Sequence, residues 1–355
     1  MAMTTWLEKQ WWLKRDTIAS TLLSPVSALY GSVTHWRRRA YSTGRLRRTH
    51  PGVPVIAVGN LVVGGGGKTP VVQAIVRCLQ QAGYRPGVVS RGYPISPKKP
   101  IVLGNRHTAE DVGDEPLLHF AIGIPVVVGA NRYAAAQALL EAHPELDVLV
   151  ADDALQHYAL MRDIEIEVVS AERVYGNGKL LPAGPLREPP ERANKCLLRI
   201  MPSWAKPTEG YKNGVYHVAI RRLGDAYALI EPQRTARLST FSDSRPNLVA
   251  GISNPRQFAD ALKRAGIDGK LHAFPDHHAY VYNDFESIGE RPILMTEKDA
   301  VKCKLFADHR MWVVPLTLHL APETKRKLLR RLTDVKNAYQ TGTQVPPQTD
   351  EPEAA

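Results

Sequence analysis

From Pro54 onward, short apolar runs alternate with longer amphipathic stretches. The runs are rich in β-branched residues and end in Gly, Ser or Asp, as strands do, and the stretches between them have helical periodicity. We expect strands at Val55–Val58, Gly87–Val89, Pro125–Val128, Val148–Val150 and Ile164–Val169, and helices at Thr69–Gln81 and Asn131–Ala142. This alternation predicts an α/β fold with βαβ units and a mostly parallel sheet. Because the strands are apolar throughout, helices should flank both faces of that sheet.

Glycine and proline interrupt this pattern between residues 171 and 210, which indicates a long functional loop or a domain boundary. A smaller second α/β portion follows, with strands expected near Val215–Ile220, Leu248–Ile252, Ile293–Met295 and Trp312–Val314. Asn254 and Pro255 have the pattern of a helix N-cap followed by proline at the first helical position. The chain therefore divides into an N-terminal segment (1–50), a core (51–210), a second portion that closes a cleft (211–338) and a disordered tail (339–355).

The N-terminal segment combines tryptophans, arginines and a helical apolar pattern. It holds nine Lys and Arg residues against two acidic ones, so much of the +11 net charge of this 355-residue chain is concentrated there. Apolar positions recur at roughly helical spacing, with Pro25 expected to kink the run: Ile18, Leu22, Leu29, Val33 and Trp36. Trp and Arg together favour the headgroup region of an anionic membrane. We expect an amphipathic, basic helix that contacts a membrane surface.

Two alternatives to interfacial contact remain for this segment. The helix can instead pack on the main domain, with a solvated basic face. It can also span the bilayer, but the uncharged run at 17–34 is rich in Ser, Thr and Gly and contains a proline, which makes a span marginal. A cleaved signal peptide does not fit, because Lys14, Arg15 and Asp16 interrupt the hydrophobic region.

The three cysteines, Cys78, Cys196 and Cys303, are odd in number and widely spaced. None lies in a zinc-binding pattern, so we expect reduced thiols and a cytosolic location for the folded part of the chain.

The most specific motif follows the first expected strand. Residues 59–70 read GNLVVGGGGKTP, and the first long helix is expected to begin there. Successive glycines allow positive φ angles and let backbone N–H groups approach phosphate oxygens at a helix N-terminus. Lys68 would reach the β- and γ-phosphates and the Thr69 hydroxyl would ligate Mg²⁺. This pattern predicts a P-loop NTPase-like fold that binds ATP through Val62, Val63, Gly64, Gly65, Gly66, Gly67, Lys68 and Thr69.

Departures from the common P-loop pattern narrow the class of enzyme. Val62 stands where the first glycine of G-x-x-x-x-G-K-[ST] is usual, and Val63 where positioning ATPases carry a lysine. Guanine-binding proteins usually have N-K-x-D, whereas the nearest string here is Thr296-Glu297-Lys298-Asp299. These differences weaken one rival hypothesis, a GTPase or ATPase switch, and leave the other, a nucleotide-gated membrane adaptor, open.

Two carboxylates, Asp152 and Asp153, lie at the end of the expected strand Val148–Val150. Ligands of open α/β sheets bind at that end of the strands, and an aspartate there commonly holds Mg²⁺. A helix cap or turn is the simpler alternative. Two further strings are weak on their own: Gly113-Asp114-Glu115-Pro116 and Asp276-His277-His278.

Taken in order, these strings resemble the tetraacyldisaccharide 4′-kinase family, the lipid A 4′-kinases of Gram-negative bacteria. The resemblance extends from about Leu22 to Lys304. It departs from the family pattern at Gly66, where Ser, Thr or Asn is frequent, and at Ala154, where glycine is usual. Seven strings carry it besides the P-loop: SPVSALY at 24–30, SRGY at 90–93, GDEP at 113–116, DDALQH at 152–157, LPAGPLREP at 181–189, FPDHH at 274–278 and TEKDAVK at 296–302.

This resemblance implies an ATP- and Mg²⁺-dependent kinase that phosphorylates the 4′-hydroxyl of a tetraacyldisaccharide 1-phosphate at the cytoplasmic face of the inner membrane. It implies that Asp114 and His277, which we prefer over His278, form a catalytic Asp–His pair that works with Lys68. It further implies that Mg²⁺ is surrounded by Thr69, Asp152, Asp153 and Glu188, and that the substrate cleft includes Tyr93, His157 and Arg187. We expect no nucleic-acid partner, since no such motif is present, and no obligate protein partner.

Overall fold

The computed structural model describes residues 8–13, 15–64, 66–204 and 216–343. Several expectations fall outside these ranges, among them Gly65 of the P-loop, residues 211–215 and most of the expected C-terminal tail.

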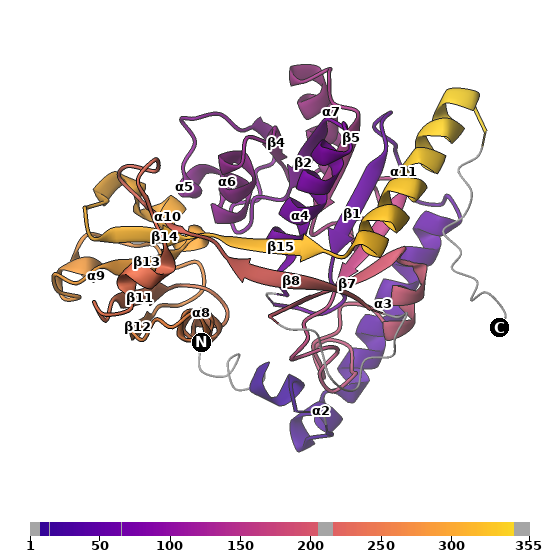
Figure 1. Cartoon of the computed structure of the whole chain (residues 1–355). Helices are drawn as coiled ribbons and strands as arrows, with labels where there is room; N and C mark the ends of the chain where they lie inside the picture. Colours follow the sequence, from indigo (N-terminus) through magenta and orange to yellow (C-terminus); the bar gives the residue numbers. More distant parts are fainter. Residues whose placement is uncertain (1–7, 14, 65, 205–215, 344–355) are drawn as a thin grey trace.

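A nine-stranded sheet forms the centre of the molecule (Figure 1), in the order β15-β8-β7-β6-β1-β5-β2-β4-β3. All neighbours pair in parallel except β15 with β8 and β3 with β4, which confirms a mostly parallel sheet. Its strands are β1 (Val55–Gly59), β2 (Pro86–Ser90), β3 (Ile101–Val102), β4 (Val126–Val128), β5 (Val148–Asp152), β6 (Ile164–Val168), β7 (Leu198–Ser203), β8 (His217–Leu223) and β15 (Leu316–Leu320).

Both faces of this sheet are buried. On one face, α4 (Lys68–Gln81) and α11 (Pro322–Thr341) pack against alternate side chains of β1, β5 and β6. The other face is covered by α7 (Arg132–Ala142) and by the loops around residue 180. Shorter helices α5 (Ala109–Val112), α6 (Asp114–Ala121) and η1 (Pro190–Lys195) complete this part of the chain. The coverage explains why β1 and β5 are apolar at almost every position.

A second sheet has the order β10-β9-β14-β13-β11-β12 and its own apolar core. Its strands are β9 (Ala226–Ala228), β10 (Thr235–Ala236), β11 (Asn247–Ala250), β12 (Lys270–Ala273), β13 (Ile293–Thr296) and β14 (Met311–Val314). Around it lie α8 (Pro255–Arg264), α9 (Asn283–Glu286), α10 (Glu297–Cys303), η2 (Leu238–Phe241) and η3 (Lys304–Phe306). Asn254 is the N-cap of α8 with proline following, as expected, although its side chain makes no capping hydrogen bond.

The two sheets divide the chain differently from the expected boundaries at 210 and 338. Strand β7 lies within the segment expected to be a loop, and β8, β15 and α11 belong to the first sheet and its core. The chain therefore leaves the first sheet after β8 and returns through β15, and these antiparallel neighbours connect the two portions (Figure 1). The expected tail also starts too early, because α11 continues to Thr341. These boundaries depend on pairing between strands that are far apart in the sequence, and such pairing cannot be read from local composition.

The N-terminal segment forms α2 (Ile18–Leu22) and α3 (Ser24–Ser42). Pro25 does not kink a continuous helix as expected, because it lies in the first turn of α3, where proline is well tolerated. One side of α3 packs on the core: Ser27 Oγ donates to Leu180 O (2.8 Å) and Tyr30 Oη to Arg187 O (3.1 Å). Within the described ranges, we find no helix whose length and hydropathy would allow it to cross a membrane.

Candidate active site

The phosphate-binding loop lies where β1 ends and α4 begins. Strand β5 is the parallel neighbour of β1, with Val58 opposite Asp152, so the expected carboxylates lie beside the loop. Gly64 (φ 91°) and Gly67 (φ 79°) have the positive φ angles that side chains disfavour, as the glycine run predicts. The N-terminal N–H groups of α4 follow directly, which leaves an anion-binding backbone at this edge of the sheet.

Lys68 is held by two side chains at this edge. Its ammonium donates to Asn60 Oδ1 (3.0 Å) and lies 3.4 Å from Asp153 Oδ1. Asp153 also accepts from Arg187 Nη1 at 3.1 Å. Burial of Asp153 acts to raise its pKa, but Lys68 and Arg187 together hold the pKa below its ordinary value. This carboxylate is therefore charged at neutral pH and keeps both cations at the mouth of the loop.

Asp152 has the environment of a metal-binding carboxylate. It is 2% exposed, and its Oδ2 lies 3.2 Å from Nε2 of His119. Its Oδ1 is buried and has no hydrogen-bond partner among the described residues. A buried carboxylate oxygen without a partner is costly unless an ion or water binds it, so this residue fits Mg²⁺. The Thr69 hydroxyl lines the same cavity and would be the second protein ligand.

Glu188 is less well placed for the metal. It accepts hydrogen bonds from Gln156 Nε2 (3.1 Å) and from the Tyr158 hydroxyl, and burial raises its pKa. In the ranges described above, no three His, Cys, Asp or Glu side chains form a group that could hold a metal ion. The expected metal carboxylates thus do not make an all-protein cage, which agrees with the preference of Mg²⁺ for phosphate and water ligands.

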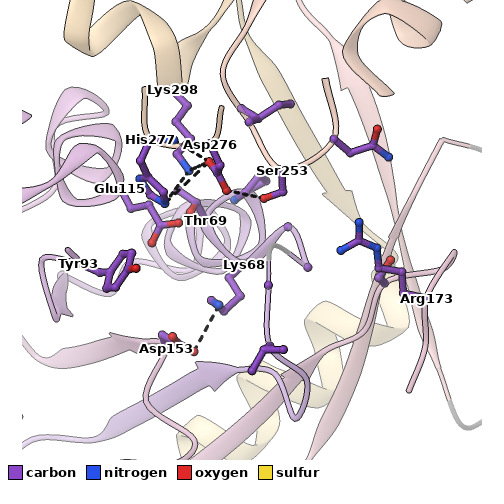
Figure 2. Close-up of a pocket in the computed structure, with 18 of the residues that line it drawn as sticks. Lys68, Thr69, Tyr93, Glu115, Asp153, Arg173, Ser253, Asp276, His277 and Lys298 are labelled. Atoms are coloured by element: carbon purple, nitrogen blue, oxygen red, sulfur yellow. Dashed lines mark hydrogen bonds and ion pairs between the residues drawn. The ribbon is translucent and has the colours of Figure 1, made fainter. Parts of the chain in front are cut away.

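A second cluster of polar side chains lies opposite the loop (Figure 2). His277 Nδ1 lies 2.9 Å from Asp114 Oδ1 and 3.1 Å from its Oδ2, across 163 positions of sequence. Burial acts to raise the pKa of Asp114, but the hydrogen bond with His277 and nearby Lys298 keep it below its ordinary value. The same hydrogen bond raises the pKa of His277. His278 instead contacts Asp284 at 3.0 Å, so the structure pairs His277 with Asp114.

Local backbone geometry places this Asp–His pair. Asp114 begins α6 directly after Gly113, whose φ is 85° and whose Cα lies so close to Tyr93 that an added Cβ would be 2.5 Å from the Tyr93 carbonyl. Glycine is therefore required before the aspartate. The Tyr93 ring packs edge-on against His277 with centroids 5.7 Å apart. His277 itself has φ 61°, a left-handed conformation that turns the imidazole toward α6.

One cavity of about 1240 Å³ joins the loop to the second cluster. Most of the expected site residues line it: Val63, Gly64, Gly66, Gly67, Lys68, Thr69, Tyr93, Asp152, Asp153, Arg187, Glu188 and His277. Val62 is buried and pairs with Leu186, and Asp114 lies behind His277. His157 does not line this cavity, contrary to the expected cleft position. Burial and the surrounding arginines lower its pKa to about 4.

Four further polar residues belong to the site but had no role in the sequence analysis: Asn60, Glu115, Asp276 and Lys298. Each lies beside a residue that was singled out or within a string that was recognised. Burial, together with the nearby charge of Asp152, raises the pKa of Glu115, which Figure 2 shows between Thr69 and His277. In the sequence, these residues could have been found only because they lie next to recognised motifs. Their contacts within the site become apparent only in the folded structure.

Three comparisons with known proteins show what this chain is similar to. The family model described as LpxK, tetraacyldisaccharide-1-P 4′-kinase, matches residues 19–333. The tetraacyldisaccharide 4′-kinase of Idiomarina loihiensis is 41% identical over 336 residues, which cover 94% of this chain and 99% of that protein. That of Azoarcus sp. (strain BH72) is 43% identical over 327 residues, with 91% and 94% covered.

Among solved structures, the "apo" form of LpxK from Aquifex aeolicus in complex with ATP has the same fold. Its TM-score is 0.73 at 27% sequence identity, and the match covers 88% of this chain and 99% of that one.

Proposed function

This chain belongs to the tetraacyldisaccharide-1-P 4′-kinase family, and we propose that the cavity between its two portions performs the phosphoryl transfer of that family. The protein is an ATP-dependent kinase whose acceptor is the 4′-hydroxyl of a tetraacyldisaccharide 1-phosphate, and whose product is the 4′-phosphorylated lipid A precursor. The observation that carries the mechanism is that Lys68 and His277, from two distant segments, line one cavity. A switch GTPase or a membrane adaptor has no need of an Asp–His pair facing its P-loop.

Phosphoryl transfer depends mainly on positioning and charge neutralisation. The glycine N–H groups and Lys68 bind the ATP phosphates, which turns the γ-phosphoryl group toward the second cluster. Thr69 and Asp152 would hold Mg²⁺, which when bound neutralises the charge that develops on the phosphates, and Asp153 keeps Lys68 and Arg187 in place. The Asp114–His277 pair accepts the proton of the acceptor hydroxyl, an effect of about 10²–10⁴-fold in rate.

The acceptor is a lipid, and the N-terminal helices provide a way to meet it in its bilayer. Ile18 (83% exposed), Leu22 (74%), Leu29 (66%) and Trp36 (61%) recur along one exposed face of α2 and α3. Arg38 and Arg39 follow Trp36 in the sequence, and a neighbouring side of α3, with Tyr30 and Arg37, lines the cavity. An amphipathic helix whose apolar face is exposed and whose polar face carries Lys or Arg binds in a membrane interface. We place the enzyme at the cytoplasmic face of the inner membrane, bound by this exposed apolar face.

A transfer assay with a lipid disaccharide 1-phosphate, comparing ATP with GTP in the presence of Mg²⁺, tests the function. We expect phosphate to appear on the 4′-position with ATP and much less with GTP. Hydrolysis of nucleotide without phosphorylation of the lipid would support the switch hypothesis instead.

A further inference from the structure

His119 is a buried histidine that lies just beyond the recognised GDEP string and contacts the metal side of the cavity. It is on α6, five positions after Asp114, and it is 0% exposed. Its Nε2 lies 3.2 Å from Oδ2 of Asp152, the carboxylate at the end of β5. Its Nδ1 is buried and has no hydrogen-bond partner among the described residues. Asp152 is therefore the one side chain of the described chain to which this imidazole hydrogen-bonds.

This contact treats the two oxygens of Asp152 differently. An ionised carboxylate only accepts hydrogen bonds, so Nε2 of His119 carries a hydrogen and donates it to Oδ2. Oδ1 is buried and has no partner in the part of the chain that the structure describes, and Asp152 lines the cavity together with Thr69. The hydrogen bond thus engages one oxygen and leaves the other for a ligand in the cavity.

Helix α6 is also attached to the helix that carries Thr69. Gln73 lies one helical turn after Thr69 on α4, and its Nε2 donates to Leu118 O (3.0 Å) in the buried interior. That carbonyl belongs to the last turn of α6, where helix carbonyls have no partner within the helix. His119, the next residue along the chain, is therefore held at a fixed place relative to both groups expected to bind the metal.

We propose that His119 is a positioning residue for Mg²⁺, which holds the Asp152 carboxylate by Oδ2 and so leaves Oδ1 free to bind the ion together with Thr69. This inference rests on the proposed function and adds to it a residue that touches neither nucleotide nor acceptor. A hydrogen bond to a ligating carboxylate fixes its orientation, and its loss typically weakens metal affinity by about 10–100-fold. Because α6 begins with Asp114, one short helix then places both the metal carboxylate and the partner of the proton acceptor.

The contribution of Mg²⁺ to nucleotide binding tests this role. Calorimetric titration of the full-length protein with AMP-PNP, a non-hydrolysable analogue of ATP, is carried out once with Mg²⁺ and once with EDTA. We expect Mg²⁺ to strengthen binding to the wild type. His119→Leu removes the donor and keeps a side chain of similar size. In this variant we expect the gain from Mg²⁺ to fall by about tenfold, with the Kd in EDTA changed by less than about twofold.

His272→Leu is the matched control. It removes a histidine whose Nε2 bonds to Asn247 Oδ1 (3.0 Å) in the second sheet, and residue 272 does not line the cavity. We expect its gain from Mg²⁺ to equal that of the wild type.

Two amide variants keep the test informative if leucine destabilises the core. The amide nitrogen of glutamine reaches the place of histidine Nε2, whereas that of asparagine reaches only the place of Nδ1. We expect His119→Gln to keep most of the gain from Mg²⁺ and His119→Asn to lose it, although both bury one amide and should lower the melting temperature to a similar extent.

Two results would overturn the proposal. If the leucine and asparagine variants melt at lower temperature but keep the full gain from Mg²⁺, His119 only stabilises the core. If Mg²⁺ does not strengthen AMP-PNP binding to the wild type, Asp152 is not a metal ligand that needs positioning. These titrations contain no acceptor, so a failure to phosphorylate the lipid disaccharide would count against the proposed function, and the Mg²⁺ dependence of AMP-PNP binding decides this inference.

Discussion

The two halves of the cavity differ in how they are built. The phosphate-binding half takes Asn60, Lys68 and Asp153 from adjacent parallel strands and the loop that joins β1 to α4. The proton-accepting half takes Asp114 from one portion of the chain and His277 from the other. The first half is fixed by the register of one sheet. The second exists only when α6 lies against α10, so it depends on how the two portions are placed.

This difference predicts which function is lost when each half is altered. Damage to the phosphate half should remove ATP binding and transfer together. Damage to the Asp–His half should remove transfer and leave ATP binding intact, because the P-loop and its partners belong to the first sheet alone.

The largest effect is expected at Lys68. Lys68→Met removes the cation that neutralises phosphate charge, and it leaves Asp153 with one cationic partner fewer. We expect the transfer rate to fall by about 10³-fold and ATP affinity to fall with it, as measured by steady-state kinetics and nucleotide titration. Lys304→Met, at an exposed position in the second portion, is the control and should leave both unchanged. Retention of full ATP affinity in Lys68→Met would contradict the assignment of Lys68 to phosphate binding.

Asp114→Ala should separate the two halves. We expect a loss of transfer of about 10²–10⁴-fold, because the imidazole loses the group that orients it, with ATP binding unchanged. Calorimetric titration with ATP and the lipid assay measure the two properties in the same variant. Turnover close to that of the wild type would exclude a catalytic role for the pair, and loss of ATP binding would show that the two halves are coupled.

The pH dependence of the transfer rate gives a second test of the Asp–His half of the cavity. His277 must be neutral to accept a proton, and the hydrogen bond with Asp114 raises its pKa above the ordinary value of a histidine. The transfer rate should therefore fall as the pH drops through that raised pKa. In Asp114→Asn the raising charge is lost, so the acid limb should move to lower pH. If the acid limb of Asp114→Asn stays at the wild-type pH, the limb reports the titration of a group other than His277.

A smaller effect is expected from the exposed face of α3, which belongs to neither half. Leu29→Glu places a charge on the apolar face, and we expect several-fold weaker sedimentation with anionic vesicles. Transfer to an acceptor dispersed in detergent should be nearly unchanged, because residue 29 does not line the cavity. Leu305→Glu makes the same substitution at an exposed position on the second portion and is the control. Equal vesicle binding by both variants would contradict the membrane-facing role of α3.

The smallest effect is expected at Ala154. Glycine is usual at this position in the family that the sequence resembles, yet the residue with positive φ is Asp153 (48°), and Ala154 is buried beside it. Ala154→Gly should therefore lower stability by about 0.5–1 kcal/mol through the greater freedom of the unfolded chain, with little change in rate. Thermal unfolding and the transfer assay measure the two effects. A marked gain in rate would show that the methyl group does restrict the site.

The sequence alone determined five strands of the first sheet (β1, β2, β4, β5 and β6), the helices α4 and α7, and most of the phosphate-binding half. Val55–Gly59, the glycine run and Lys68-Thr69 are contiguous, so their geometry follows from local rules for strands, glycines and helix N-termini. Asp152 could be placed as well, because parallel strands end at the same edge of a sheet. The other half was expected only through family resemblance, since an aspartate before Glu-Pro and two adjacent histidines are weak patterns.

Tertiary structure decided the rest. It placed β8 and β15 in the first sheet and α11 against it, and it showed that His157 does not line the cavity. It also brought Lys298 to the imidazole of His277. Each of these results depends on contacts between segments tens to hundreds of residues apart, and such contacts leave no periodic trace in the chain. The donor site could be predicted because it is local, whereas the proton acceptor and the residues that tune it are set by the packing of two sheets against each other.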